Sequence, residues 1–303
     1  EIGDLNDRAK LTEVLRQYKI DTVMHFAAYA YVGESVEQPL MYYHNNVATT
    51  INVLRAMGDA GVRRFVFSST CAVYGDPTKV PITEDERKAP VSPYGRSKLM
   101  VEQILADAAA ADKQFQFAAL RYFNASGCAP DGAIGEDHRP ETHLIPVVLQ
   151  AILGVRPGIT VFGTDYPTPD GTNVRDYIHV DDLADAHILA MEKLSGEPIY
   201  CNLGTGRGFS VREIISTCEK VTEKKAPVTF GARRAGTRLR CTPMQAARRS
   251  CWDGRRNIGS RRRSFDRRGT GLRSIRAGMN DWLDFFCPQF FQCGLFDLAD
   301  ALA

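Results

Sequence analysis

Short apolar runs alternate with helical stretches through the first part of the chain. The apolar runs are DTVMHFAA (21–28), RFVFSS (64–69) and FQFAALRYFN (115–124), and helical stretches at 45–61 and 97–113 lie between them. Runs without polar alternation are typical of strands buried on both faces, and strands separated by helices of this length predict βαβ units. The pattern therefore predicts an α/β fold with a Rossmann-type, doubly wound parallel sheet.

The pattern loosens after residue 124 into two Gly- and Pro-rich loops, 127–143 and 163–177. A helical segment at 144–154 separates them, and a helix, a strand and a helix are expected at 180–194, 198–204 and 210–222. Loops of this length inside a compact domain are more often functional than incidental. We therefore expect a smaller mixed C-terminal domain.

The end of the chain has a different composition. Residues 227–303 hold fifteen Arg and no Lys against six Asp and no Glu, a charge of +9, and since the whole chain carries +2 the first 226 residues carry −7. Arg-rich segments can bind nucleic-acid phosphates, but these Arg are not interleaved with aromatic residues and follow no helical face. We expect no nucleic-acid partner.

Membrane, secreted and metal-binding classes also lack support. No apolar run approaches the length of a membrane span, and EIGDLNDRAK (1–10) has no signal-peptide pattern, so we expect a cytoplasmic protein without a membrane partner. The eight Cys form no CxxC pair and no His/Cys ligand spacing. We therefore expect reduced thiols and no bound metal.

The central chemical feature is SPYGRSKLMVEQ (92–103), where Tyr94 and Lys98 are four residues apart at the start of a predicted helix. They share one helix face, and an adjacent ammonium favours the phenolate and lowers a phenol pKa that is ordinarily about 10. The pair can therefore form a general base. On its own it is weak evidence, because a surface helix can hold both residues by chance.

Three hydroxyls close the preceding strand, Ser68, Ser69 and Thr70. The carboxyl edge of an open α/β sheet is where ligands bind, so a hydroxyl there can contact a substrate oxygen while Tyr94 exchanges its proton. The alternative is a Ser/Thr turn that caps the next element. The two features in this order favour a catalytic site.

The same pair stands among several long motifs in unbroken order between residues 3 and 236. They are HFAAYAYVGES (25–35), NN (45–46), SSTCAVYG (68–75), LRYFNASG (120–127) and GTDYPTPDGTNVRDYIHVDDLADAH (163–187). Together they resemble the UDP-glucose 4-epimerases of the extended short-chain dehydrogenase/reductase class. The resemblance implies an NAD-dependent isomerase that inverts C4 of a UDP-hexose, UDP-glucose or UDP-galactose, through a 4-keto intermediate and transient hydride transfer.

The resemblance also implies individual roles. Tyr94 is then the base at the sugar 4-hydroxyl, Lys98 binds the nicotinamide ribose and tunes Tyr94, and Thr70 contacts the substrate and assists proton transfer. The further cofactor contacts are Asp4, Leu5, Phe26, Ala27, Ala28, Asn45 and Phe123. The further UDP-sugar contacts are Asn124, His143, Leu144, Phe162, Arg175 and Arg234. A guanidinium can bind phosphate oxygens in pairs, although a salt bridge from Arg175 to Asp176 is an equal alternative.

The domain organisation follows from the same resemblance. Residues 1–124, with 176–203 packed back onto them, correspond to the NAD-binding part, and 125–236 to the nucleotide-sugar part of a homodimer. The chain opens at GDLND (3–7), which matches the end of a third strand. We therefore expect a dinucleotide-binding domain that lacks its first strand and Gly-rich turn.

Two other motifs have simpler explanations. GTGRG (204–208) follows a strand, but Phe209 stands where the third glycine of a dinucleotide fingerprint would be, so a tight turn is expected. HVDD (179–182) could suggest a metal site, yet carboxylates at a helix N-terminus explain it.

The tail, 237–303, departs from the family. Back-translating it and reading each codon one nucleotide early allows Asp-Pro-Pro from Thr237 onward and Leu-Tyr-Ala-Asp from Cys241 onward, both of which suit the family's continuation. Our hypothesis is a frameshift near Gly236. A single intact frame in the resequenced coding DNA would contradict it.

Three alternatives to a UDP-glucose 4-epimerase remain. The first is another UDP-sugar 4-epimerase, acting on UDP-arabinose/xylose or UDP-glucuronate, and the second is an inactive epimerase fragment. The third and remotest is a nucleic-acid-binding protein with a basic tail. A 4,6-dehydratase is disfavoured, because Cys71 and Ala72 stand after Thr70 where acidic residues would be needed.

Overall fold

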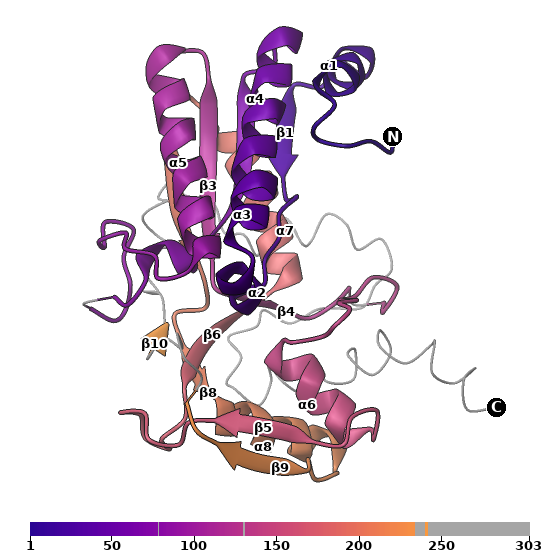
Figure 1. Ribbon diagram of the computed structural model, residues 1–303, viewed down its shortest axis with the longest axis vertical. Helices are drawn as coiled ribbons and strands as arrows, with labels where there is room; N and C mark the ends of the chain where they lie inside the picture. Colours follow the sequence, from indigo (N-terminus) through magenta and orange to yellow (C-terminus); the bar gives the residue numbers. More distant parts are fainter. Residues whose placement is uncertain (78, 130, 234–239, 242–303) are drawn as a thin grey trace, which may run out of the picture.

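The computed structural model describes residues 1–77, 79–129, 131–233 and 240–241. At its centre lies a parallel sheet in the order β1 (Thr22–His25), β2 (Arg64–Thr70), β3 (Gln116–Tyr122) and β7 (Ile199–Leu203). Apolar residues fill the middle of each strand, as expected for a sheet covered on both faces. The predicted α/β fold is confirmed, and Figure 1 shows helices in front of this sheet and behind it.

Side chains of β2 alternate between two apolar clusters on the two faces. Phe65 and Phe67 pack on one face, and Val66 packs on the other. The first face is covered by α1 (Arg8–Gln17), α4 (Thr49–Ala60) and α5 (Pro93–Ala111), and the second by α7 (Val180–Lys193). The strand period of two therefore builds the doubly wound arrangement.

The connection from β1 to α4 is more elaborate than the predicted helix 45–61. It runs through α2 (Val32–Glu37), α3 (Pro39–Tyr43) and a π-helical turn (His44–Ala48) before α4. Such turns are rare in proteins, and many of those that occur lie at functional sites. This one contains Asn45 and presents Asn46 to Ser97 of α5, whose hydroxyl accepts a hydrogen bond from the Asn46 amide at 3.1 Å.

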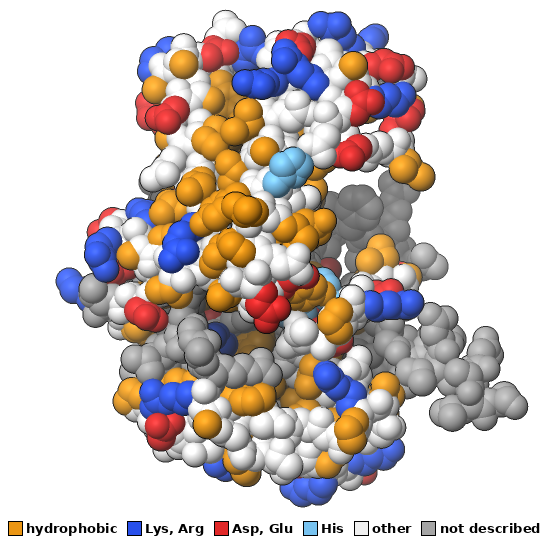
Figure 2. Space-filling model, in the orientation of Figure 1, with side chains coloured by type: hydrophobic (Ala, Val, Ile, Leu, Met, Phe, Trp, Pro, Cys, Tyr) orange, Lys and Arg blue, Asp and Glu red, His pale blue; other side chains and the backbone are white. Residues whose placement is uncertain are grey.

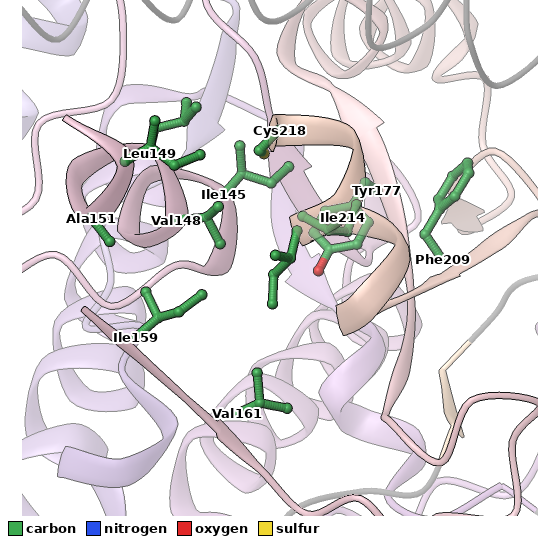
Figure 3. Close-up of a cluster of buried hydrophobic side chains, with 12 residues drawn as sticks. Ile145, Val148, Leu149, Ala151, Ile159, Val161, Tyr177, Phe209, Ile214 and Cys218 are labelled. Carbon is green, nitrogen blue, oxygen red and sulfur yellow. The ribbon is translucent and has the colours of Figure 1, made fainter. Parts of the chain in front are cut away.

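The second half of the chain forms a separate apolar core around α6 (Leu144–Ile152) and α8 (Val211–Thr222) (Figure 3). Ser210 begins α8 with a reciprocal capping box, in which Glu213 accepts from the Ser210 amide. The strands here are β4 (Asn124–Ser126), β5 (Ile159–Phe162), β6 (Val174–His179), β8 (Gly208–Ser210), β9 (Val228–Gly231) and β10 (Arg240–Cys241). They form a β10-β6-β4 sheet with β8 on β6, and a separate β5-β9 pair.

Two predicted elements differ in detail. The expected strand 115–124 breaks at Phe123 into β3 and β4, which belong to different sheets. The chain passes from the central sheet to the second core at this break. No helix in the described part of the chain is long and apolar enough to cross a bilayer. Arg234 and most of the Arg-rich tail lie outside the described residues, so the frameshift hypothesis stays a prediction.

Candidate functional site

Tyr94 and Lys98 lie in the first two turns of α5, at the carboxyl end of β2. Ser92 begins this helix, because its side chain accepts from the Gly95 amide at 3.2 Å and Pro93 occupies the first helical position. Tyr94 is half-buried and Lys98 is 3% exposed. The Lys98 ammonium donates to the Ser68 carbonyl at 2.8 Å, which joins the helix directly to the strand end.

The surroundings of Lys98 destabilise its charge. Burial lowers the pKa of Lys98 to about 7. The ammonium lies 4.9 Å from the centroid of the Phe67 ring. His25 belongs to the same buried region, and its Nε2 lies 3.0 Å from the Thr50 hydroxyl. Burial, followed by the Lys98 charge, lowers the pKa of His25 to about 4. At neutral pH, His25 is therefore uncharged, and Lys98 is close to the midpoint of its titration.

Thr70 is the last residue of β2 and caps the 3-10 turn Cys71–Tyr74. Its hydroxyl accepts from the Ala72 amide at 3.1 Å, so the capping role considered as an alternative does occur. The hydroxyl hydrogen is still able to bond a ligand, since a hydroxyl is also a donor. The other two hydroxyls have protein partners: Ser68 pairs with the Tyr122 hydroxyl, and Ser69 donates to Glu102 at 2.6 Å.

Gly95 lets α5 approach this 3-10 turn closely. A Cβ at position 95 would lie 2.7 Å from the Ala72 carbonyl oxygen and 3.0 Å from the Pro90 Cβ. The first distance is too short for any side chain and involves backbone. Glycine thus holds the turn of α5 that carries Tyr94 directly against the segment that follows Thr70.

A buried ion pair lies one turn beyond Lys98, and the sequence analysis did not identify it. Arg121 of β3 donates to both oxygens of Glu102 at 2.9 and 2.6 Å, and both side chains are at most 3% exposed. Arg121 also donates to the Tyr74 hydroxyl at 2.8 Å. The carboxylate of Glu102 raises the pKa of Arg121 against the opposing effect of burial. The signal was an Arg inside an apolar run and a Glu four residues after Lys98.

The residues expected to contact the cofactor fall into separate groups. Leu5, Phe26 and Ala27 line a mostly apolar cavity of about 310 Å³ along β1. Phe26 is 55% exposed, and Ala28 beside it is half-buried. Phe123 instead lies in a buried cluster with Val73, Tyr74 and Ile82.

The other two residues expected to contact the cofactor, Asp4 and Asn45, are polar. Asp4 is exposed and accepts from the Asn6 amide at 2.8 Å. Asn45 donates to the Asn46 side chain at 3.0 Å, which places it beside Ser97. The structure therefore brings Asn45 toward α5, whereas Asp4 lies before α1.

The residues expected to contact the UDP-sugar come from neighbouring elements of the second half. Asn124 donates to the Asp176 carbonyl at 2.7 Å and pairs in register with Tyr177. Arg175 donates to the Asn173 side chain and to the Val174 carbonyl. Leu144 begins α6 after His143, and Phe162 ends β5. Arg234 lies outside the described residues.

Asp176 points away from Arg175, because adjacent strand residues face opposite sides. Its carboxylate accepts from the amides of Thr205 and Gly206 at 2.9 and 2.8 Å. Burial outweighs these donors and raises the pKa of Asp176 to about 6. GTGRG (204–208) is thus a turn wrapped around a carboxylate between two strands, as expected. At HVDD, His179 caps α7 and accepts from the Asp181 amide at 3.1 Å.

His143 is half-exposed at the start of α6, and two carboxylates face it. Its Nδ1 lies 2.7 Å from a Glu136 oxygen and 3.0 Å from a Glu141 oxygen. The hydrogen bond with Glu136, more than any other cause, raises the pKa of His143.

A family comparison identifies the class of this arrangement. The model of the NAD dependent epimerase/dehydratase family matches residues 1–204. The chain belongs to this family. Among curated epimerase/dehydratase relatives, the UDP-glucose 4-epimerase of Lacticaseibacillus casei is 50% identical over 238 residues, which cover 77% of this chain and 71% of that protein. UDP-glucose 4-epimerase 2 of Arabidopsis thaliana is 48% identical over 237 residues, 77% of this chain and 68% of that protein.

Solved structures of the family agree. The UDP-glucose 4-epimerase of Brucella ovis in complex with NAD superposes with a TM-score of 0.84 at 42% identity, covering 96% of this chain and 84% of that one. The Bifidobacterium longum UDP-glucose 4-epimerase in complex with NAD+ and UDP gives 0.82 at 35% identity, covering 97% and 82%. The resemblance drawn from the sequence motifs is confirmed.

Proposed function

We propose that this chain interconverts UDP-glucose and UDP-galactose by NAD-dependent inversion at C4. The relatives named above are UDP-glucose 4-epimerases, and the two solved structures hold NAD or NAD with UDP. One observation carries the proposal for this chain itself. Lys98 is buried at the carboxyl end of β2, one helical turn from Tyr94, with its ammonium on the Ser68 carbonyl.

Tyr94 would act as the base at the sugar 4-hydroxyl. The Lys98 ammonium, fixed by Ser68 and poorly solvated, favours the phenolate form of a neighbouring tyrosine. Thr70, with its lone pair engaged by the Ala72 amide, has its hydroxyl hydrogen to donate to the same sugar oxygen. Tyr94 thus accepts the 4-hydroxyl proton and returns it after the inversion.

The cofactor side of the site fits NAD in part. Leu5, Phe26 and Ala27 line an apolar cavity, and Lys98 offers a buried ammonium for a ribose hydroxyl. Asp4, Ala28, Asn45 and Phe123 are proposed as further contacts by resemblance. When bound, NAD would supply the hydride acceptor, and then the hydride donor, for C4 of the sugar. Within the described residues, no Gly-rich turn leads from a parallel strand directly into a helix to hold the pyrophosphate.

The UDP-sugar would lie against the second half of the chain. Asn124 and Arg175 come from adjacent strands, and His143 and Leu144 come from the start of α6. The planar guanidinium of Arg175 suits a diphosphate. Phe162 at the end of β5 and Arg234 complete the proposed set. Residues 1–124 with 176–203 thus form the proposed cofactor part, and 125–236 the substrate part.

We also propose a homodimer through α2, α3 and α5. Val36, Leu40 and Met100 are 64%, 80% and 41% exposed on these packed helices. Figure 2 shows hydrophobic side chains gathered over this face, and apolar patches of this kind mark protein contacts. Sedimentation analysis of Leu40→Asp tests it, with Ile134→Asp as a control outside the patch. The cytoplasmic location stays a prediction.

The activity test is a UDP-galactose to UDP-glucose assay with NAD supplied, alongside measurement of copurifying NAD by absorbance. Tyr94→Phe should lower turnover by about 100-fold or more, whereas Tyr18→Phe, at an exposed tyrosine directly after α1, should leave it unchanged. Equal activity of wild type and Tyr94→Phe would remove Tyr94 as the base. Wild-type turnover of UDP-arabinose or UDP-glucuronate in place of UDP-galactose would select the other epimerase class.

A further inference from the structure

The loop between β4 and α6 gathers two histidines and a glutamate. One ligand atom from each of Glu136, His138 and His143 lies within 4.8 Å of the others. A Glu136 oxygen is 2.7 Å from Nδ1 of His143 and 3.2 Å from Nε2 of His138. Two imidazole nitrogens therefore converge on one carboxylate.

A hydrogen or a metal ion must lie between these groups. Nδ1 of His143 faces oxygens of both Glu136 and Glu141, and it repels them unless a proton or a metal ion lies between. Glu141 is itself fixed by the amides of Thr142 and His143, each at 2.7 Å. The nearby cations are otherwise engaged: Arg139 pairs with Asp137, and Arg156 donates to the Glu141 carbonyl.

A neighbouring tyrosine orients the second imidazole. The Tyr31 hydroxyl lies 3.1 Å from Nδ1 of His138 and 3.4 Å from the Pro140 carbonyl. When Tyr31 donates to Pro140, it accepts from Nδ1–H, and Nε2 of His138 then presents its lone pair toward Glu136. Protein metal sites commonly fix an imidazole in this way through its other nitrogen.

We propose that Glu136, His138 and His143 bind one divalent transition-metal ion of the zinc type. Two imidazoles and one carboxylate, with water in the remaining position, are a normal ligand set for such an ion. The metal would take the place of the proton shared between His143 and the two carboxylates. This site differs from the sequence-based expectation of no bound metal. That expectation rested on the cysteine spacing and on HVDD, whereas the proposed ligands follow the pattern Glu-x-His-x4-His.

A bound ion would join two parts of the site. Tyr31 lies between β1 and α2, whereas His143 begins α6, so the metal would link the cofactor side to the start of the substrate helix. His143 is also a proposed substrate contact. If that assignment holds, which rests on the proposed function, the metal and the UDP-sugar compete and the ion inhibits turnover.

The test uses Co2+ as a spectroscopic substitute for Zn2+, with the purified full chain and no nucleotide present. Wild type should bind about one Co2+ per chain, with a visible d–d absorption that Zn2+ abolishes. The spectrum should lack the near-ultraviolet charge-transfer band that thiolate ligands produce, because the proposed ligands are nitrogen and oxygen. His138→Gln and Glu136→Gln should weaken Co2+ binding by at least about 10-fold.

Matched controls lie close by. Asp137→Asn removes a carboxylate of the same loop and His44→Gln removes an exposed histidine elsewhere, and both should bind Co2+ like wild type. Wild-type absorption that persists in both site variants, or a thiolate band, would overturn the proposal, as would no binding at all. Epimerase activity measured in EDTA reports on the proposed function separately. Activity in EDTA with no Co2+ binding would reject the metal site alone.

Discussion

The two halves of this molecule place their charged groups in opposite ways. Under α5, the central sheet buries Lys98, Glu102 and Arg121 within its core, where each has defined partners. The core around α6 and α8 is built mainly from apolar side chains (Figure 3). Glu136 and His143 come from the segment between β4 and α6 and are not part of this core. The proposed cofactor ligand Lys98 is therefore enclosed by packed protein, whereas His143, a proposed contact of the sugar nucleotide, is half-exposed.

Breaking the buried ion pair should have the largest effect on stability. Arg121→Met leaves the Glu102 carboxylate buried without its guanidinium and should cost about 3–5 kcal/mol of unfolding free energy, measured by urea denaturation. The double variant Glu102→Met/Arg121→Met removes both charges and should recover most of that loss. If Arg121→Met were as stable as wild type, the buried charges of the first half would not contribute to its stability as described.

A cavity in the second core should cost slightly less. Ile214 of α8 is fully buried among apolar neighbours, and Ile214→Ala should lower the unfolding free energy by about 3 kcal/mol. The loss should be the same at pH 6 and pH 9, because no charge is involved. Ile188→Ala on α7, where the side chain is 48% exposed, is the matched control and should change stability by about 0.5 kcal/mol or less. A strongly pH-dependent loss at Ile214 would contradict the apolar description.

Removing the buried ammonium should stabilise the fold while abolishing function. The pKa of Lys98 is lowered from 10.5 to about 7, so the cost of burying its charge is complete below pH 7 and disappears as pH rises toward 10.5. The shift sets an upper limit of about 5 kcal/mol, and the lost hydrogen bond to Ser68 offsets part of it. We expect Lys98→Met to be about 2 kcal/mol more stable at pH 6.

The gain in unfolding free energy from Lys98→Met should be smaller at pH 9 than at pH 6, and the variant should lack turnover at both pH values. Urea denaturation at the two pH values measures it, with the exposed Lys113→Met as the control. A variant less stable than wild type at pH 6 would mean that the ammonium contributes net stability in its site. In that case Lys98 would resemble a structural lysine more than a functional one.

The smallest effect concerns the loop. Glu136→Gln removes the main group that raises the pKa of His143, so the His143 midpoint should move to lower pH in an NMR titration in EDTA. The stabilisation from this pair is present below the unfolded-state pKa of histidine and is lost as pH rises through the folded-state value. Because His143 is half-exposed, the stability change should be below about 1 kcal/mol. Asp137→Asn should leave the His143 midpoint unchanged, and a midpoint that moves equally in both variants would assign the shift to general loop charge.

Local patterns predicted most of the fold, because strand and helix periods are properties of neighbouring residues. Phe65 and Phe67 belong to an apolar run, and that run is β2. The break at Phe123 was missed because the run continues across it while its two parts join different sheets. The motifs likewise located Tyr94 and Lys98. They did not show that Ser69 faces Glu102, since that contact joins positions 33 residues apart.

Gly95 sets a limit on how this sequence can vary. A methyl group there would meet the Ala72 carbonyl at 2.7 Å, and neither backbone can retreat without moving Tyr94 relative to Thr70. A surface helix position tolerates most substitutions, and the exposed neighbour Arg96 should do so. In a library that carries every amino acid at position 95 and is selected for turnover, glycine should therefore be almost the only residue recovered. Sequence variation at this position is thus limited by one backbone contact.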